Sequence, residues 1–173
     1  MYDDDAPLDY TGGVAERMFA LASSLQSPTI VEIGVRNGNS FRLWLDATQH
    51  NGGRVIGIDI QTTYAAVPWA RGLLIVDSAH RVAQHWALPI DLLYIDGDHT
   101  TEGFQTDLNA WYPHVKAGGH ILIHDITNDG HIQAMVPVLA KFCATEQLTW
   151  ETWPNECGVA HVVKPIQSDA KNP

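Results

Sequence analysis

Five acidic residues and one histidine stand where short apolar runs of the sequence end. In chain order they are Glu32, Asp59, Asp77, Asp96, His124 and Asp125. Carboxylates accept hydrogen bonds from hydroxyl and ammonium groups, and together with imidazole they bind divalent cations. Residues of these types at successive run ends predict one polar site that binds a polar ligand, a metal ion or both.

The first apolar run, Thr29 to Ile33, leads into a turn that contains Gly34 and Gly38. Glycine lets the backbone take left-handed dihedral angles and approach a ligand closely. A dinucleotide-binding turn requires G-x-G-x-x-G, and Arg36 stands where its second glycine would be, which disfavours a pyrophosphate. Glu32, just before the glycines, suits a ligand that carries an ammonium group. An ordinary strand-to-helix turn is the alternative interpretation.

The stretch E-I-G-x-x-x-G resembles the first motif of the class I S-adenosylmethionine-dependent methyltransferases. The resemblance implies that Glu32, Gly34 and Gly38 hold the methionine half of S-adenosyl-L-methionine. It further implies that the hydroxyl of Ser40 hydrogen-bonds to the carboxylate of this methyl donor.

The next two run ends extend this interpretation to the nucleoside half of the donor. Asp59 can accept hydrogen bonds from both ribose hydroxyls, and Ile60 is expected to lie against the adenine face. The resemblance implies that Asp77 and Ser78 read the adenine amino group. Each acid alone could be a solvated loop residue, but acids at four successive run ends favour a cofactor site.

Residues 92–125 resemble the small metal-assisted O-methyltransferases, a group that includes catechol, caffeoyl-CoA and macrolide-sugar enzymes. The resemblance implies that Asp96, His124 and Asp125 bind a divalent metal, Mg²⁺ or Mn²⁺, with Asp96 also part of the donor site. A histidine departs from the oxygen ligands that Mg²⁺ prefers and opens the site to manganese, iron or zinc. In the alternative interpretation no metal binds, Asp125 caps a loop and His124 packs under the sheet.

His99 lies three residues after Asp96, where the resemblance implies the base that deprotonates the acceptor. An imidazole with an unperturbed pKa of about 6.5 accepts a proton at neutral pH. Asp98 is the second candidate, as a base or as the residue that orients the imidazole. Alternatively, His99 is a helix-start residue that hydrogen-bonds within its own loop. His131 is a further candidate for lining the acceptor pocket.

The elements that must position these residues follow from periodicity. Strands are predicted at 29–33, 54–59, 73–76, 91–95, 120–123, 148–153 and 158–164, with helices between the first five. Asn39 or Ser40 is the expected cap of the helix that follows the strand at 29–33. This pattern predicts an α/β fold with a doubly wound, Rossmann-like, seven-stranded sheet. The sheet is expected to be mostly parallel with an antiparallel C-terminal hairpin and helices on both faces.

Length and composition bound the remaining possibilities. The 173 residues predict a single domain, 1–173, with an entry arm at 1–13 and a flexible tail at 167–173. A net charge of −10 gives no basic surface for nucleic acid. The two cysteines lack metal-type spacing, and no long apolar run indicates a signal peptide or a membrane span. We therefore expect a soluble, cytoplasmic protein.

Together these features predict an S-adenosylmethionine-dependent methyltransferase that methylates a hydroxyl of a small molecule with divalent-metal assistance. The sequence shows no lid-forming extension, so the acceptor site is expected to be shallow or completed by a second subunit in a homo-oligomer. A metal-dependent hydroxylase or hydrolase, and a non-catalytic S-adenosylmethionine-binding protein, are the alternatives. A nicotinamide-dependent oxidoreductase is disfavoured by Arg36.

Overall fold

A computed structural model describes residues 13–61, 71–126, 135–153 and 158–166. Most of the predicted entry arm, the predicted tail and His131 therefore lie outside the described residues. The described strands form one seven-stranded sheet in the order β3-β2-β1-β4-β5-β7-β6. They are β1 (Thr29–Ile33), β2 (Arg54–Asp59), β3 (Gly72–Val76), β4 (Ile90–Ile95), β5 (Val115–His124), β6 (Trp150–Trp153) and β7 (Val159–Val163).

The strand pairings confirm the predicted sheet. The first five strands pair in parallel, β1 with β2 and β4, β2 with β3, and β4 with β5. The last two depart from this, because β7 runs antiparallel to both β5 and β6. The strand order reverses between β1 and β4, and ligands of such sheets bind at this switch point, beyond the carboxyl ends of the strands.

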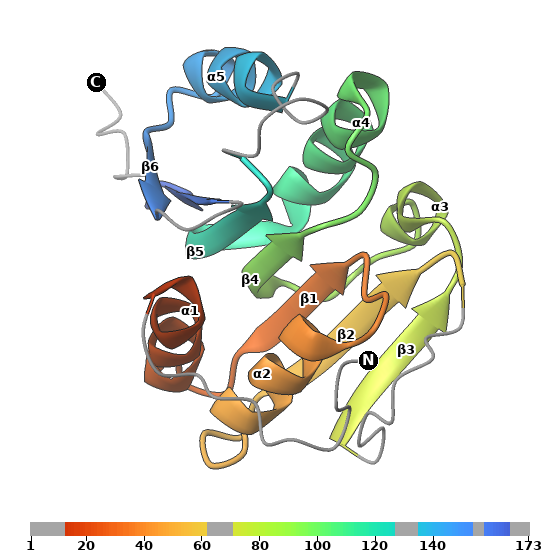
Figure 1. Ribbon diagram of the computed structural model, residues 1–173, viewed down its shortest axis with the longest axis vertical. Helices are drawn as coiled ribbons and strands as arrows, with labels where there is room; N and C mark the ends of the chain where they lie inside the picture. The colour runs from red at the N-terminus through yellow and green to blue at the C-terminus, as the bar shows by residue number, and fades with distance from the viewer. Residues whose placement is uncertain (1–12, 62–70, 127–134, 154–157, 167–173) are drawn as a thin grey trace, which may run out of the picture.

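Helices cover both faces of the sheet (Figure 1). α1 (Gly13–Ser24) and α2 (Asn39–Ala47) pack on one face. α3 (Ala79–Ala83), α4 (Thr101–Trp111) and α5 (Met135–Thr145) pack on the other. A short 3₁₀ turn, η2 (Tyr112–His114), connects α4 to β5. Among the described residues, no helix has the length and apolar character needed to cross a membrane.

The central strand β1 is buried along its whole length, which explains its β-branched composition. Val31 and Ile33 face the core beneath α3, α4 and α5. Ile30 faces the core beneath α1 and α2. Because side chains alternate along a strand, Glu32 points to the same side as Ile30, into an apolar layer. This placement decides how Glu32 takes part in the site.

Two local predictions differ from the structure. The cap of α2 is Gly38, with φ of 78°, and not Asn39 or Ser40. The Ser40 hydroxyl hydrogen-bonds to Glu32 and does not cap the helix. The helix begins instead after Gly38, which takes the left-handed conformation. The helix after the third strand, which the sequence predicts from about Ala79 to Trp86, ends at Ala83, because the backbone after Ala83 continues in i to i+3 hydrogen bonds.

Candidate functional site

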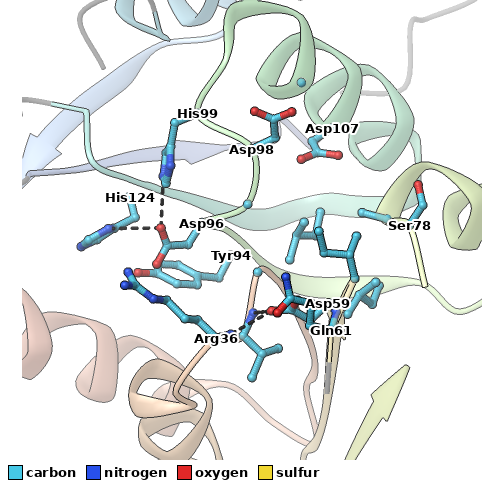
Figure 2. Close-up of a pocket in the computed structure, with 18 of the residues that line it drawn as sticks. Arg36, Asp59, Gln61, Ser78, Tyr94, Asp96, Asp98, His99, Asp107 and His124 are labelled. Carbon is cyan, nitrogen blue, oxygen red and sulfur yellow. Dashed lines mark hydrogen bonds and ion pairs between the residues drawn. The ribbon is translucent and has the colours of Figure 1, made fainter. Parts of the chain in front are cut away.

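A cleft with a volume of about 1260 Å³ lies over the carboxyl ends of the strands. Its walls come from the ends of β1, β2, β4 and β5 and from the N-terminal turns of α2 and α4 (Figure 2). We call residues 34–40 together with Asp59 the glycine-loop end of this cleft. Asp96, His99, His124 and Asp125 form its histidine–aspartate end. The topology thus brings together most of the run-end residues singled out in the sequence.

The glycine loop depends on a close backbone approach at Gly34. Gly34 has φ of 83°, and a Cβ atom there would lie 2.1 Å from the carbonyl oxygen of Asp96. Only glycine fits this crossing between the first and fourth strands. Arg36 takes a left-handed conformation with φ of 45°, although it is not a glycine. The backbone shape that the missing second glycine would favour is therefore present, at a cost in strain.

Glu32 lies beneath the cleft and does not line it. Its exposed fraction is 0%, whereas Ser40 lines the cleft wall. The Ser40 hydroxyl donates a hydrogen bond to Glu32 Oε1 at 2.5 Å. Burial raises the pKa of Glu32 well above its ordinary value, despite this hydrogen bond. In this structure Glu32 therefore supports Ser40. Its carboxylate does not line the cleft, where the sequence predicted it to contact a ligand ammonium group.

Asp59 holds the glycine loop through backbone hydrogen bonds. Its Oδ2 atom accepts from the amides of Val35 at 2.9 Å and Arg36 at 2.8 Å. Its Oδ1 atom accepts from the amide of Gln61 at 3.0 Å, which leaves this oxygen one lone-pair direction for a ligand. The carboxylate predicted to bind ribose is thus fixed in place and retains some capacity to accept a hydroxyl.

The residues after β2 and β3 border the same cleft. Asp77 and Ser78 both line it, and so does Ile60, whose side chain is 72% exposed. Asp77 Oδ1 accepts a hydrogen bond from the Ser78 amide and forms an ion pair with Arg81. Much of the hydrogen-bonding capacity of Asp77 is therefore used within its own turn.

Asp96, His124 and Asp125 converge at the histidine–aspartate end. One possible ligand atom from each lies within 4.8 Å of the others. His124 Nδ1 is 3.4 Å from Asp96 Oδ1 and 3.3 Å from Asp125 Oδ1. Asp125 takes a left-handed conformation, with φ of 60°, which turns it back toward the cluster. Such strain in a residue other than glycine is typical of functional sites.

His99 joins this cluster from the loop before α4. Its Nε2 atom lies 3.4 Å from Asp96 Oδ1 (Figure 2). The same atom lies 3.2 Å from Asp125 Oδ2. His99 Nε2 and His124 Nδ1 are both buried and lack a well-formed hydrogen bond. Two imidazole nitrogens facing two carboxylates require a proton or a cation between them. The donor set therefore fits a metal ion.

The charges at this end influence one another. Burial raises the pKa of Asp96, but the imidazoles of His124 and His99 outweigh it, so the pKa is lowered overall. The hydrogen bond to Asp96 raises the pKa of His99 above its ordinary value. Burial lowers the pKa of His124, yet Asp96 and Asp125 together raise it. The neighbouring carboxylates therefore make each imidazole a stronger proton acceptor than a free imidazole.

Asp98 occupies a different position from the one expected of an orienting residue. Its Oδ1 atom accepts a hydrogen bond from the Thr100 amide at 2.8 Å, and its side chain covers Gly103 on α4. The imidazole of His99 instead meets Asp96 and Asp125. Within the described residues, the orientation of His99 thus comes from these two aspartates.

Sequence reasoning missed Asp107, a buried acid on α4 that lines the cleft. The sequence contained a pattern that could have identified it. Phe104, Leu108 and Trp111 form the apolar face of this helix, and Asp107 falls on that face by spacing. An acid on an apolar helix face is unusual unless it meets a partner or a ligand. Its chemistry is taken up below.

Comparison with known proteins identifies related chains. A family model described as a methyltransferase domain matches residues 31–126. The uncharacterized protein R132 of Acanthamoeba polyphaga mimivirus is 29% identical over 92 residues, which cover 48% of this chain and 42% of that protein. The matched segment includes every residue of both cleft ends.

Solved structures share the fold at low sequence identity. The MycE methyltransferase of the mycinamycin biosynthetic pathway, in complex with Mg and SAH, has a TM-score of 0.67 and 22% identity over 91% of this chain. An O-methyltransferase from Bacillus cereus in complex with SAH has a TM-score of 0.66 and 17% identity over 86% of this chain. This chain covers 80% of the Bacillus cereus protein. It spans only about half of MycE and less than half of the mimivirus protein.

Proposed function

Because this chain belongs to the methyltransferase domain family, we propose that it transfers a methyl group from S-adenosyl-L-methionine to a hydroxyl oxygen of a small molecule. The observation that carries the proposal is a continuous cleft with two chemically different ends. Its glycine-loop end suits an amino-acid nucleoside. Its histidine–aspartate end suits an acceptor that must lose a proton.

The glycine-loop end supplies contacts for the donor. The N-terminus of α2, with Gly38 and Asn39 in the cleft wall, presents backbone amides to a carboxylate. Ser40 Oγ donates its proton to Glu32 and so offers the methyl donor an acceptor lone pair, which suits the ammonium group. Asp59 has a free acceptor direction for a ribose hydroxyl. The MycE and Bacillus cereus structures, both in complex with SAH, support a donor of this kind.

The histidine–aspartate end supplies the proton acceptor. In the proposed reaction the acceptor oxygen forms a bond to the methyl carbon, while the carbon–sulfur bond breaks and its electron pair stays on sulfur. The hydroxyl proton passes to His99, whose imidazole is held by Asp96 and Asp125. His99 and the glycine loop line one cleft, so the two reactants can meet within it.

Asp96, His124 and Asp125 are the residues that would hold a divalent metal. When bound, such a metal would supply positive charge that stabilises an ionised acceptor hydroxyl. The imidazole of His124 favours Mn²⁺ or another transition metal over Mg²⁺, which prefers oxygen ligands alone. MycE, a protein of this fold, was solved in complex with Mg, which supports a metal at this end of the cleft.

Two experiments test the proposal. Isothermal titration calorimetry should detect binding of S-adenosylhomocysteine and none of NAD⁺; binding of NAD⁺ alone would contradict it. Methyl transfer from labelled donor to a panel of catechols, sugars and hydroxamates should then depend on His99. Replacement His99→Ala should lower the rate by roughly 10²-fold or more. The control His85→Ala changes an exposed histidine outside the cleft and should leave the rate unchanged.

The dependence on metal is measured separately. Methyl transfer should fall after treatment with a chelator and return on addition of Mn²⁺. A rate that withstands both the chelator and His99→Ala would reject the proposed chemistry while leaving donor binding intact. The metal-dependent hydrolase alternative would be favoured if S-adenosylhomocysteine fails to bind but Mn²⁺ does.

A further inference from the structure

Asp107 is a buried carboxyl group whose hydrogen-bonding capacity is unused within the described residues. Its exposed fraction is 7%, and it lines the cleft from α4. No described residue donates a hydrogen bond to it or forms an ion pair with it. A carboxyl group that is largely buried loses most of its hydration, so a hydrogen-bond donor reaching it through the cleft would stabilise it.

The surroundings of Asp107 make ionisation unfavourable. Burial, with the nearby charge of Asp98, raises the pKa of Asp107 to about 6. Asp107 is thus near half ionisation in mildly acidic solution. A hydrogen-bond donor supplied by a ligand would stabilise the charged form and reduce this penalty.

The backbone of the β4 end leaves room for this carboxyl group. A Cβ atom on Gly97 would lie 3.3 Å from Asp107 Oδ2 and 3.1 Å from a methyl group of Ile33. Glycine at this position therefore lets the carboxyl group approach the sheet edge closely. The acid sits beside the switch point and not on the outer surface of α4.

Within the cleft, Asp107 lies away from the histidine–aspartate end. Figure 2 shows it between Asp98 and Ser78, on the side opposite to His124. Ile33, Ile58 and Ile60 line the same cleft and offer apolar surface to a flat ring. In Asp77, the acid expected to read the adenine, Oδ1 is engaged by Ser78 and Arg81, and the residue is only partly buried. Asp107 is the more deeply buried acid at this side, and no described residue engages either of its oxygens.

We propose that Asp107 accepts a hydrogen bond from the exocyclic amino group of the adenine and so selects donors that carry a 6-aminopurine. This inference rests on the proposed use of S-adenosyl-L-methionine. It assigns adenine recognition to α4 instead of to the turn that follows β3. Asp107 then acts in donor binding and takes no part in proton transfer.

The test is a double-mutant cycle on ligand affinity. Calorimetry at pH 8 compares S-adenosylhomocysteine with its 6-deamino analogue, in which hydrogen replaces the amino group. In the unmodified protein, loss of the amino group should weaken binding by about 10-fold or more, the range for a hydrogen bond to a charged group. In the variant Asp107→Ala the two ligands should bind equally, within about twofold.

Two further variants serve as controls. Asp107→Asn keeps an acceptor oxygen and should retain much of the preference for the amino group. Asp91→Asn changes an acid that holds Thr29 and Lys116 away from the cleft lining, and should retain all of it. Circular dichroism of each variant shows whether it is folded before its affinity is compared. If Asp107→Ala does not fold, Asp107→Leu, which fills the same space without an acceptor oxygen, is measured in its place and should likewise lose the preference for the amino group.

Several results would overturn the inference, and each is distinct from failure of the proposed function. Equal binding of the two ligands to the unmodified protein would show that nothing reads the amino group. A preference that survives Asp107→Ala would assign the reading to another residue. A changed KM for the acceptor with unchanged donor affinity would place Asp107 in the acceptor site. Failure of the unmodified protein to bind S-adenosylhomocysteine at all would instead reject the function proposed above, and this inference with it.

Discussion

The two ends of the cleft satisfy their polar groups in different ways. At the glycine-loop end, Asp59 accepts three backbone hydrogen bonds of 2.8 to 3.0 Å, and Ser40 is bonded to Glu32. At the histidine–aspartate end, the contacts to the imidazole nitrogens are 3.2 to 3.4 Å, and two of those nitrogens lack a good hydrogen bond. The first end is mostly satisfied without a ligand, although Glu32 Oε2 beneath it has no hydrogen-bond partner among the described residues, while the second end lacks a central positive charge.

This difference indicates how each end works. A preformed loop lowers the entropy that must be lost when a donor binds, because its backbone is already ordered. A cluster of carboxylates and imidazoles that is only partly satisfied responds strongly to a cation or a proton. Changes at the first end should therefore affect folding and donor affinity together. Changes at the second should affect metal affinity with little effect on the donor.

The largest effect is expected from Gly34→Ala, which changes the close backbone contact between the two ends of the cleft. The new Cβ atom would lie 2.1 Å from the carbonyl oxygen of Asp96. The alanine backbone would also have to keep a positive φ. We expect a loss of about 2–4 kcal/mol in the free energy of unfolding, measured by urea denaturation. The matched control is Gly118→Ala, which has φ of 77° but whose Cβ would only touch Ile166 at 3.4 Å. It should cost about 1 kcal/mol, the penalty of the backbone conformation alone. Equal losses would contradict the proposed backbone clash.

The next effect is expected from Asp125→Asn at the histidine–aspartate end. Loss of an outer-shell partner weakens metal binding by roughly 10–100-fold. Removing the charge of a direct ligand should weaken Mn²⁺ binding by at least this factor. Electron paramagnetic resonance of Mn²⁺ measures the free ion directly. Affinity for S-adenosylhomocysteine without metal should change by less than about twofold, because the glycine loop is self-supporting. A large parallel loss of donor affinity would show that the two ends are not separate.

A smaller effect, of opposite sign, is expected from Asp107→Asn. Because the pKa of Asp107 is raised from 3.8 to about 6, the folded protein binds more protons than the unfolded chain between these values. Stability should therefore fall as pH rises through this window, and the cost persists above it. Replacing the acid by Asn should stabilise the free protein by on the order of 1–2 kcal/mol at pH 8, after allowance for solvent screening.

The measurement for Asp107→Asn is urea denaturation at pH 8 and at pH 4. The gain in stability should vanish near pH 4, where the acid of the unmodified protein is protonated in the folded state. A variant that is less stable than the unmodified protein at pH 8 would show that Asp107 has a stabilising partner. It would also weaken the case that the group awaits a ligand.

The smallest effect on stability is expected from Asp59→Asn. The amide oxygen can replace Oδ2, but its NH₂ group would face the Gln61 amide, so one hydrogen bond worth about 1 kcal/mol is lost. The NH₂ group also cannot accept a ribose hydroxyl, so donor affinity should fall by about 10-fold. Asp91→Asn, which loses comparable bonds outside the cleft lining, should lower stability without this loss of affinity. Unchanged affinity in Asp59→Asn would remove Asp59 from the donor site.

The sequence predicted the fold and the location of the cleft well, because both depend on local patterns. Short β-branched runs such as Thr29–Ile33 alternate with helical periodicity, and the closing antiparallel pair follows from the short connection before Val159–Val163. Residues at the carboxyl ends of parallel strands must meet at one edge of the sheet. Asp59, Asp96 and Asp125 were found in this way.

Predictions about individual side chains were less complete, because burial is a three-dimensional property. Glu32 was expected to face the ligand, but strand alternation turns it into the core, where it supports Ser40. Asp98 was expected beside His99, but it caps the turn at Thr100. Asp107 was overlooked, although its place on the apolar face of its helix was visible in the spacing.

By itself the sequence determined the order of the elements and which residue types end each strand, since hydrophobic periodicity and glycine spacing act over a few residues. Only the tertiary structure decided which of these groups share a cleft, which are satisfied and which are not. The reason is that hydrogen bonds, ion pairs and pKa shifts depend on separations of 3 to 4 Å between atoms. Asp96, His99 and Asp125 reach such separations only when β4 and β5 lie side by side, and Asp107 joins them in one cleft only when α4 packs over the sheet.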